Sequence, residues 1–134
     1  MAFDALFNEW IGGIVATSNP ADNIEAYFFG LFEDESGYTL YLIGSGNYNE
    51  ENGDWACPID MTEDGPVYDF MPEEAYLDLP EDEFSDLEWD AVTDIIVEKL
   101  DEYCQSEAFA KSFFNKAKVI ATGFDEGDMI IIKS

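Results

Sequence analysis

The chain has 134 residues with 31 carboxylates, five lysines and no arginine or histidine, so its formal net charge is −26. Apolar residues make up 47% and aromatic residues 16%, which excludes an intrinsically disordered chain, because disordered segments lack the groups that reward collapse. The length predicts a single domain over residues 1–134, and the charge disfavours direct nucleic-acid binding because phosphates would be repelled.

The N-terminal half predicts one helix followed by strands. Apolar residues recur at helical spacing over residues 3–15, which predicts a helix with one buried stripe. The runs 24–32 and 38–43 are short, rich in aromatic residues and separated by an acidic loop, which predicts a β-hairpin. Both runs are apolar on both faces, so we expect them in the centre of a sheet covered by helices on at least one side. A third antiparallel strand is predicted at 54–57.

Residues 58–84 predict an irregular connection. They contain four of the five prolines and no long periodic segment. Proline removes a backbone donor and restrains the residue before it, so we expect at most one helical turn, near 72–75. The aromatic residues of this connection favour an ordered segment that wraps over the domain.

The C-terminal third predicts two helices. Ser85 and Glu88 match a capping box, so a helix is predicted to begin at residue 85 and to carry an apolar stripe through residues 89–103. Ser106 is predicted to cap a second helix.

A closing hairpin is predicted after these helices, from strands at 118–122 and 129–133 around a loop at 123–127. All elements together predict an α+β fold. We expect an antiparallel sheet of about five strands, with one N-terminal helix and two C-terminal helices.

The sequence contains no complete catalytic motif. Without histidine the usual nucleophilic triads have no base, and 31 carboxylates do not single out the pair that a glycosidase needs. Cys57 and Cys104 form no CxxC motif, which excludes the usual zinc and redox spacings and predicts two reduced thiols. Residues 47–54 and 125–128 resemble calcium loops but miss the EF-hand spacing, so turns are the simpler interpretation. We expect that the protein is not an enzyme and that it uses no cofactor or metal. A module stabilised by calcium is kept as an alternative.

The sequence also predicts where the protein resides. It begins Met-Ala-Phe-Asp, with an acid where a secretory signal would be positive, and no apolar run approaches the roughly 20 residues of a membrane span. We therefore expect a cytoplasmic protein that does not enter a membrane. Because the charge opposes close self-association, we expect a monomer.

Residues 50–90 hold sixteen carboxylates interleaved with aromatic residues, and no basic residue. Aromatic side chains supply contact area, and surrounding carboxylates steer a cationic protein partner. Once the part from residue 85 is assigned to a helix, 50–83 is the predicted recognition segment. For each single residue there is an alternative to recognition: the aromatic side chains are part of the core, and the acidic ones form an ordinary solvated surface. The predicted aromatic anchors are Trp55, Tyr68 and Tyr76, and the predicted charged contacts are Asp54, Asp60, Asp69, Glu73 and Glu74.

Several short patterns carry a resemblance. Gly53-Asp54-Trp55-Ala56-Cys57 is followed by Asp69-Phe70-Met71-Pro72, by Leu79-Pro80 and by a predicted helix that bears Trp89. In a small acidic chain, this layout resembles the immunity proteins of bacterial polymorphic toxin systems. The resemblance implies a cytoplasmic antitoxin that binds and occludes a cationic toxin domain, often a nuclease. The alternative is an acidic adaptor or a DNA mimic that binds a basic regulatory protein.

Overall fold

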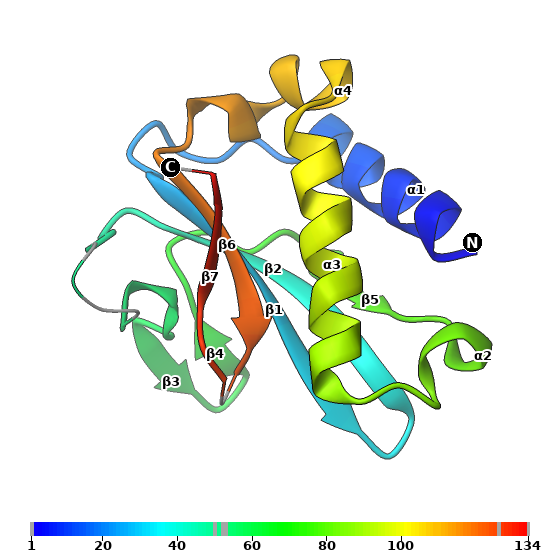
Figure 1. Cartoon of the computed structure of the whole chain (residues 1–134). Helices are drawn as coiled ribbons and strands as arrows, with labels where there is room; N and C mark the ends of the chain where they lie inside the picture. The colour runs from blue at the N-terminus through cyan, green and yellow to red at the C-terminus, as the bar shows by residue number, and fades with distance from the viewer. Residues whose placement is uncertain (1, 50, 52–53, 126, 134) are drawn as a thin grey trace.

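The structure is a computed structural model that describes residues 2–49, 51, 54–125 and 127–133 (Figure 1). Its helices are α1 (Ala2–Thr17), α2 (Glu81–Phe84), α3 (Trp89–Cys104) and α4 (Glu107–Ala110), with the 3₁₀ helices η1 (Asp54–Ala56) and η2 (Phe113–Lys116). Its strands are β1 (Ala26–Asp34), β2 (Gly37–Ser45), β3 (Asp60–Thr62), β4 (Gly65–Val67), β5 (Tyr76–Asp78), β6 (Val119–Phe124) and β7 (Ile130–Lys133). Within these ranges, no helix combines the length and the apolar character needed to cross a membrane.

Five strands form one mixed sheet in the order β5-β2-β1-β6-β7, and β3 and β4 form a separate hairpin. The α+β class is confirmed, and β1 and β2 are central, as their two-sided apolar pattern predicted. A wholly antiparallel sheet is wrong, because β1 and β6 are parallel, with Ala26 opposite Val119 and Leu31 opposite Phe124. Parallel neighbours need a crossover. Here α3 carries the chain back to the end of the sheet where β1 begins (Figure 1).

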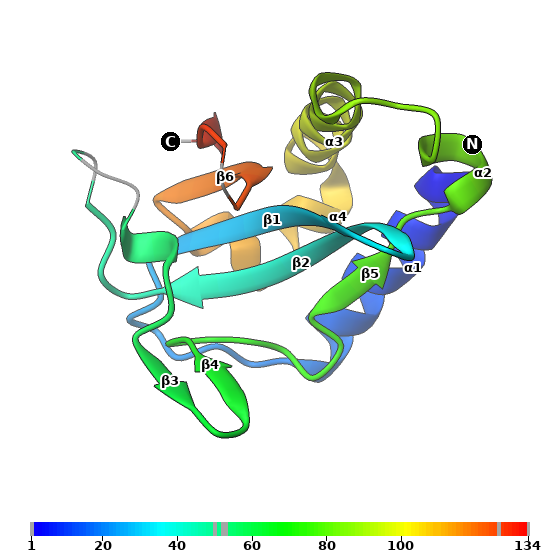
Figure 2. The ribbon, with the colours of Figure 1, turned by 90° about the horizontal axis from the view of Figure 1, so that it is seen from below.

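The two faces of the sheet are covered differently. Tyr27, Phe29 and Leu31 alternate along β1 and pack in one core cluster with α1, α3 and η2. Between them, Phe28 points to the other face, where it joins Trp55 of η1 in a smaller cluster. Figure 2 shows the β3–β4 hairpin on the side of the sheet away from α3. The sheet is therefore covered by helices on one face and by an irregular segment on the other.

The predicted irregular connection contains more regular structure than expected. Its hairpin is closed by a hydrogen bond of 2.7 Å from the Ile59 amide to the Val67 carbonyl. No helix forms at 72–75; the one short helix is α2, nearer the end of the segment. The strand predicted at 54–57 is also wrong, because the Cys57 amide donates 3.0 Å to the Asp54 carbonyl and closes the 3₁₀ turn η1. The Trp55 side chain then packs beneath this turn.

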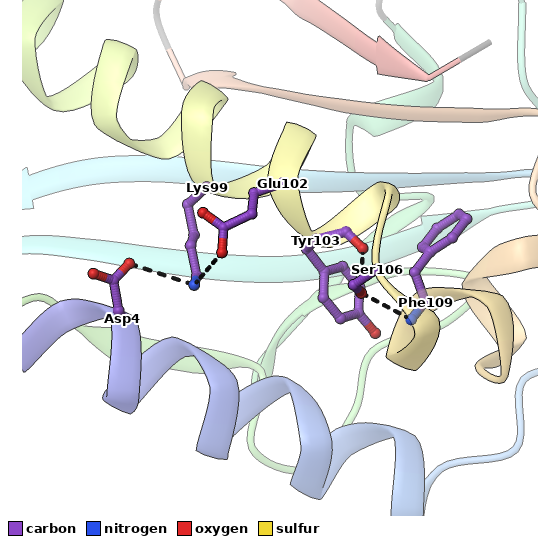
Figure 3. A network of polar contacts seen from close by, with 6 residues as sticks. All are labelled: Asp4, Lys99, Glu102, Tyr103, Ser106 and Phe109. Carbon is purple, nitrogen blue, oxygen red and sulfur yellow. Dashed lines mark hydrogen bonds and ion pairs between the residues drawn. The ribbon is translucent and has the colours of Figure 1, made fainter.

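The capping box at Ser85 does not form. α3 begins at Trp89, and the residue before it, Glu88, makes no side-chain capping bond. Ser85 instead ends α2, where its amide donates to the Glu81 carbonyl. The cap predicted at Ser106 is confirmed, since its hydroxyl oxygen accepts from the Phe109 amide at 3.2 Å (Figure 3). Ser85 differs from Ser106 in being the C-cap residue of the short helix α2.

One buried lysine joins α1 to α3. Lys99 is 5% exposed, and its ammonium lies 3.4 Å from Asp4 and 3.5 Å from Glu102 (Figure 3). The same ammonium lies 5.6 Å from the centre of the Phe7 ring. At the start of α1, the Glu83 carboxylate accepts from the Ala2 amide at 2.9 Å and from the Phe3 amide at 3.2 Å. Carboxylates at a helix N-terminus are stabilising, so Glu83 has a structural role.

Candidate binding groove

A groove of about 590 Å³ lies on the face of the sheet opposite the helices. Phe28 and Tyr41 form its floor. One wall comes from η1 and the β3–β4 side, and the other from the start of the β6–β7 connection. The walls are lined by residues 56–58, Met61, Pro66 and Tyr68 on one side and by residues 124–125 and 127–129 on the other.

The floor depends on a glycine opposite a tyrosine. Gly30 in β1 pairs with Tyr41 in β2, and a Cβ at Gly30 would lie 2.1 Å from the Tyr41 ring. The absent side chain therefore lets the ring lie across β1 and reach the β6–β7 connection. There the Tyr41 hydroxyl donates a hydrogen bond to the Asp125 carboxylate.

We expect Gly30→Ala to lower the free energy of unfolding by about 1–3 kcal/mol, the usual cost of overpacking, because the added methyl group displaces the Tyr41 ring. Denaturant unfolding followed by circular dichroism measures the change. Gly12→Ala is the matched control: no atom lies within 4 Å of the added methyl group, and alanine should stabilise α1 by about 0.5–1 kcal/mol. Equal effects of the two substitutions would contradict the close packing.

The second wall is held by backbone contacts. The Asp125 amide donates 3.0 Å to the Leu31 carbonyl, and the Gly127 amide donates 2.9 Å to the Phe124 carbonyl. Gly123 has a φ of +153°, and a Cβ there would lie 2.5 Å from the Asp128 carbonyl oxygen. Glycine at this position in β6 permits both the positive φ and the close return of the chain at Asp128, next to the segment that carries Asp125.

Two tyrosines, Tyr41 and Tyr68, line the groove together with this carboxylate, and a third tyrosine is their neighbour. The Tyr41 ring lies 6.2 Å from the ring of Tyr76, its neighbour in β5. Burial raises the pKa of Tyr68, and the nearby Asp125, Tyr76 and Cys57 raise it further. Burial also raises the pKa of Tyr41, and its hydrogen bond to Asp125 adds to this effect. We call Tyr41, Tyr68, Tyr76 and Asp125 the tyrosine–aspartate cluster.

The predicted anchors separate into two kinds. Tyr68 and Tyr76 come together in the tyrosine–aspartate cluster, although they are far apart in the predicted segment. Trp55 is only 6% exposed, with its ring 6.3 Å from Phe28 and 5.6 Å from Tyr48. The structure thus uses Trp55 as a core residue beneath the groove, which is the alternative that the sequence left open.

The predicted charged contacts do not form one patch. Asp54 and Asp60 are exposed on the groove side, in η1 and β3. Asp69 accepts from the Gly46 amide at 2.8 Å and from the Asn47 side chain at 3.3 Å, so it also holds a loop. Glu73 and Glu74 are exposed beside α1. The Trp10 indole donates 2.7 Å to the Glu74 carbonyl, and α1 covers the opposite face of the sheet.

Sequence reasoning missed Tyr41 and Asp125. It placed Tyr41 in a buried strand and Asp125 in a turn, and it gave neither a role. A signal for Tyr41 was present: glycine inside a strand often marks the close approach of another group, and the hairpin register puts Gly30 opposite Tyr41. No comparable signal marks Asp125, whose position depends on the pairing of β6 with β1.

The two calcium-like loops fall partly on residues 50, 52–53 and 126, which lie outside the described part of the chain, as does Gly53 of the pattern noted above. Among the residues that the structure describes, no three histidine, cysteine or acidic side chains are grouped so that they could hold a metal ion.

All five lysines lie away from the groove. Lys99 is in α3, Lys111 follows α4, Lys116 is in η2, and Lys118 and Lys133 lie at the end of the sheet where β6 begins and β7 ends. The β6–β7 connection with Asp125 lies at the opposite end (Figure 1). Among the residues that the structure describes, no lysine side chain therefore lies close to Asp125 or Asp128, the two carboxylates that line the groove.

Comparison of the chain with protein-family models, curated proteins and solved structures gave no match. The groove and the distribution of charge are therefore the features that indicate a function.

Proposed function

We propose that this protein binds a cationic protein domain and blocks it by occlusion, as an immunity protein does with a bacterial toxin domain. The observation that carries the proposal is the combination of exposed apolar side chains and carboxylates around the groove. Cationic domains include nucleases, whose clefts hold a polyanion; an acidic surface can fill such a cleft in place of the nucleic acid.

Several exposed apolar side chains lie on or near the β3–β4 hairpin, whereas Leu6, Trp89 and Ile131 are exposed elsewhere in the described part of the chain. Ile59 is 57% exposed, Met61 68% and Tyr76 52%. Val67, on the strand paired with β3, is also exposed. Large exposed hydrophobic groups that lie together and are surrounded by polar residues are typical of protein interaction sites.

The charges around these side chains favour one kind of partner. Asp60, Glu63 and Asp64 lie in or next to the β3–β4 turn, and Asp125 and Asp128 line or border the groove. Surfaces with one sign of charge accelerate the approach of partners with the opposite sign and repel the others. Once the two proteins have met, the apolar groups supply the contact area that holds them together.

An immunity gene is expected beside the gene of its toxin, so the product of the adjacent gene is the partner to test. We expect co-expression to rescue cells from its toxicity. The association rate, measured by stopped flow, should fall at least about tenfold from low to high salt, because electrostatic steering is screened.

Paired charge reversals locate the surface. Asp60→Lys with Asp64→Lys should slow association more than Glu9→Lys with Glu98→Lys, which makes the same change in net charge on exposed positions of α1 and α3. Equal effects would place the interface elsewhere. Salt-independent association would contradict steering, and absence of rescue would contradict the immunity role. Binding to a basic regulator without rescue would support the adaptor alternative.

A further inference from the structure

The groove combines a carboxylate at its mouth, aromatic rings beside that carboxylate and an apolar interior. Asp125 supplies the charge, Tyr41 and Tyr68 supply the rings, and Met61 and Phe28 line the interior. Asp125 is exposed to solvent, so a group from another molecule can reach it.

We propose that the groove receives an arginine side chain of the cationic partner. The guanidinium binds the Asp125 carboxylate and lies against the tyrosine rings, while the alkyl part of the side chain packs along Met61 and Phe28. This inference rests on the proposed function and names the contact through which the partner would be recognised.

The hydrogen-bonding capacity of Asp125 permits this contact. An ionised carboxylate has about four acceptor positions, and the Tyr41 hydroxyl uses one of them. A guanidinium presents five N–H donors in a plane, which suits a carboxylate that is already oriented. Because the Tyr41 bond and the Asp125 amide hold this side chain and its backbone, less order has to be created on binding.

The tyrosines distinguish arginine from lysine. Guanidinium groups are weakly hydrated and stack on aromatic faces, whereas an ammonium group is compact and strongly hydrated. Tyr41 donates to the carboxylate and Tyr68 lines the same groove, so a planar cation in the groove can contact rings and charge together. A volume of about 590 Å³ also exceeds that of one side chain and leaves room for the neighbouring residues of the partner.

The occupant has to come from another molecule. Lys118 pairs with Glu25 at 3.1 Å, and Lys133 donates 3.0 Å to the Ala117 carbonyl, both at the far end of the sheet. Lys99 is buried between α1 and α3, and Lys111 pairs with Glu107 at 3.0 Å. The fifth lysine, Lys116, lies in η2 and does not line the groove, and the chain has no arginine.

The test titrates the full-length, isotope-labelled protein with the peptide acetyl-Gly-Arg-Gly-amide and follows amide chemical shifts. The titration extends to about 10 mM, so that a contact with a dissociation constant as weak as about 1 mM is detected. The matched probe replaces arginine with citrulline, which has nearly the same shape and no charge; a third probe carries lysine. We expect shifts at the groove residues with arginine, and binding at least about fivefold weaker with lysine or citrulline.

Asp125→Asn keeps an acceptor for Tyr41 and removes the charge. It should weaken arginine binding about tenfold, while Glu9→Gln, an equal change in charge on α1, should leave it unchanged.

The inference is overturned by equal binding of citrulline, by an unchanged affinity of Asp125→Asn, by the absence of groove shifts, or by shifts only in the smaller cavity of about 400 Å³ between α1 and α3. The peptides do not involve the toxin, so these results are independent of rescue. A partner that rescues cells and binds Asp125→Asn equally well would overturn the groove contact alone.

Discussion

Phe114→Ala should lower the free energy of unfolding by about 3–5 kcal/mol, the usual cost of removing a buried phenylalanine. Phe114 is fully buried in η2, and its ring lies 4.9 Å from Tyr27, 5.8 Å from Phe29 and 6.1 Å from Tyr103. It therefore connects β1 to the end of α3. The loss is a large part of the roughly 5–15 kcal/mol that stabilises a typical domain.

Phe113→Ala is the control for this substitution. Phe113 is the neighbouring residue in the same 3₁₀ helix and is only partly buried, so its removal should cost less than half as much. Denaturant unfolding, followed by tryptophan fluorescence and circular dichroism together, measures both variants. Equal losses at the two positions would show that Phe114 does not hold the helical layer on the sheet.

Alkaline pH should strongly destabilise the protein between pH 10 and 12. Burial raises the pKa of both Tyr27 and Tyr41 far above the ordinary value of about 10, and it also raises that of Cys104, a free half-buried thiol, to about 11. A group whose pKa is raised on folding stays protonated in the native state while the unfolded chain loses its proton. The stability is therefore complete below about pH 9 and is lost as the pH rises through and above 10.

The slope of this loss can be measured. Each tyrosine kept neutral contributes about 1.4 kcal/mol per pH unit, so Tyr27 and Tyr41 together remove about 5 kcal/mol between pH 10 and 12. Tyr41→Phe should reduce the slope by about 1.4 kcal/mol per pH unit, which is the contribution of one tyrosine. Phe32→Leu disturbs a ring 6.1 Å from Tyr41 without removing a titrating group, and it should leave the slope unchanged. The prediction is wrong if absorbance shows that all tyrosines are ionised while the circular dichroism spectrum is still that of the native protein.

The elements that the sequence predicted correctly depend on short-range pattern. The first helix follows from one apolar stripe, and the central hairpin follows from two aromatic runs around an acidic loop that ends at Gly37, which has a φ of +119°. The Ser106 cap likewise needs only the amide of Phe109, three residues away. The failures at 54–57 and at Ser85 lie in segments where two local structures compete, and long-range packing decides between them.

The candidate groove was accessible from the sequence only in part. Tyr68 and Tyr76 were named from composition and meet on one face, whereas Glu73 and Glu74 were grouped with them by sequence proximity and lie beside α1. The role of Asp125 could not be predicted, because the Tyr41 hydroxyl that donates to its carboxylate is 84 residues away in the sequence. No periodicity or motif connects residues at that separation.

Three properties could be predicted before folding: the α+β class, the central position of β1 and β2, and the separation of carboxylates from lysines along the chain. These properties follow from residue type and nearest-neighbour spacing. The parallel pairing of β6 with β1, which sets the Asp125 carboxylate beside Tyr41 and makes the groove, became known from the folded chain. The reason is physical: a parallel pair forms when a crossover helix packs on the sheet, and that packing depends on contacts among residues that are distant in sequence.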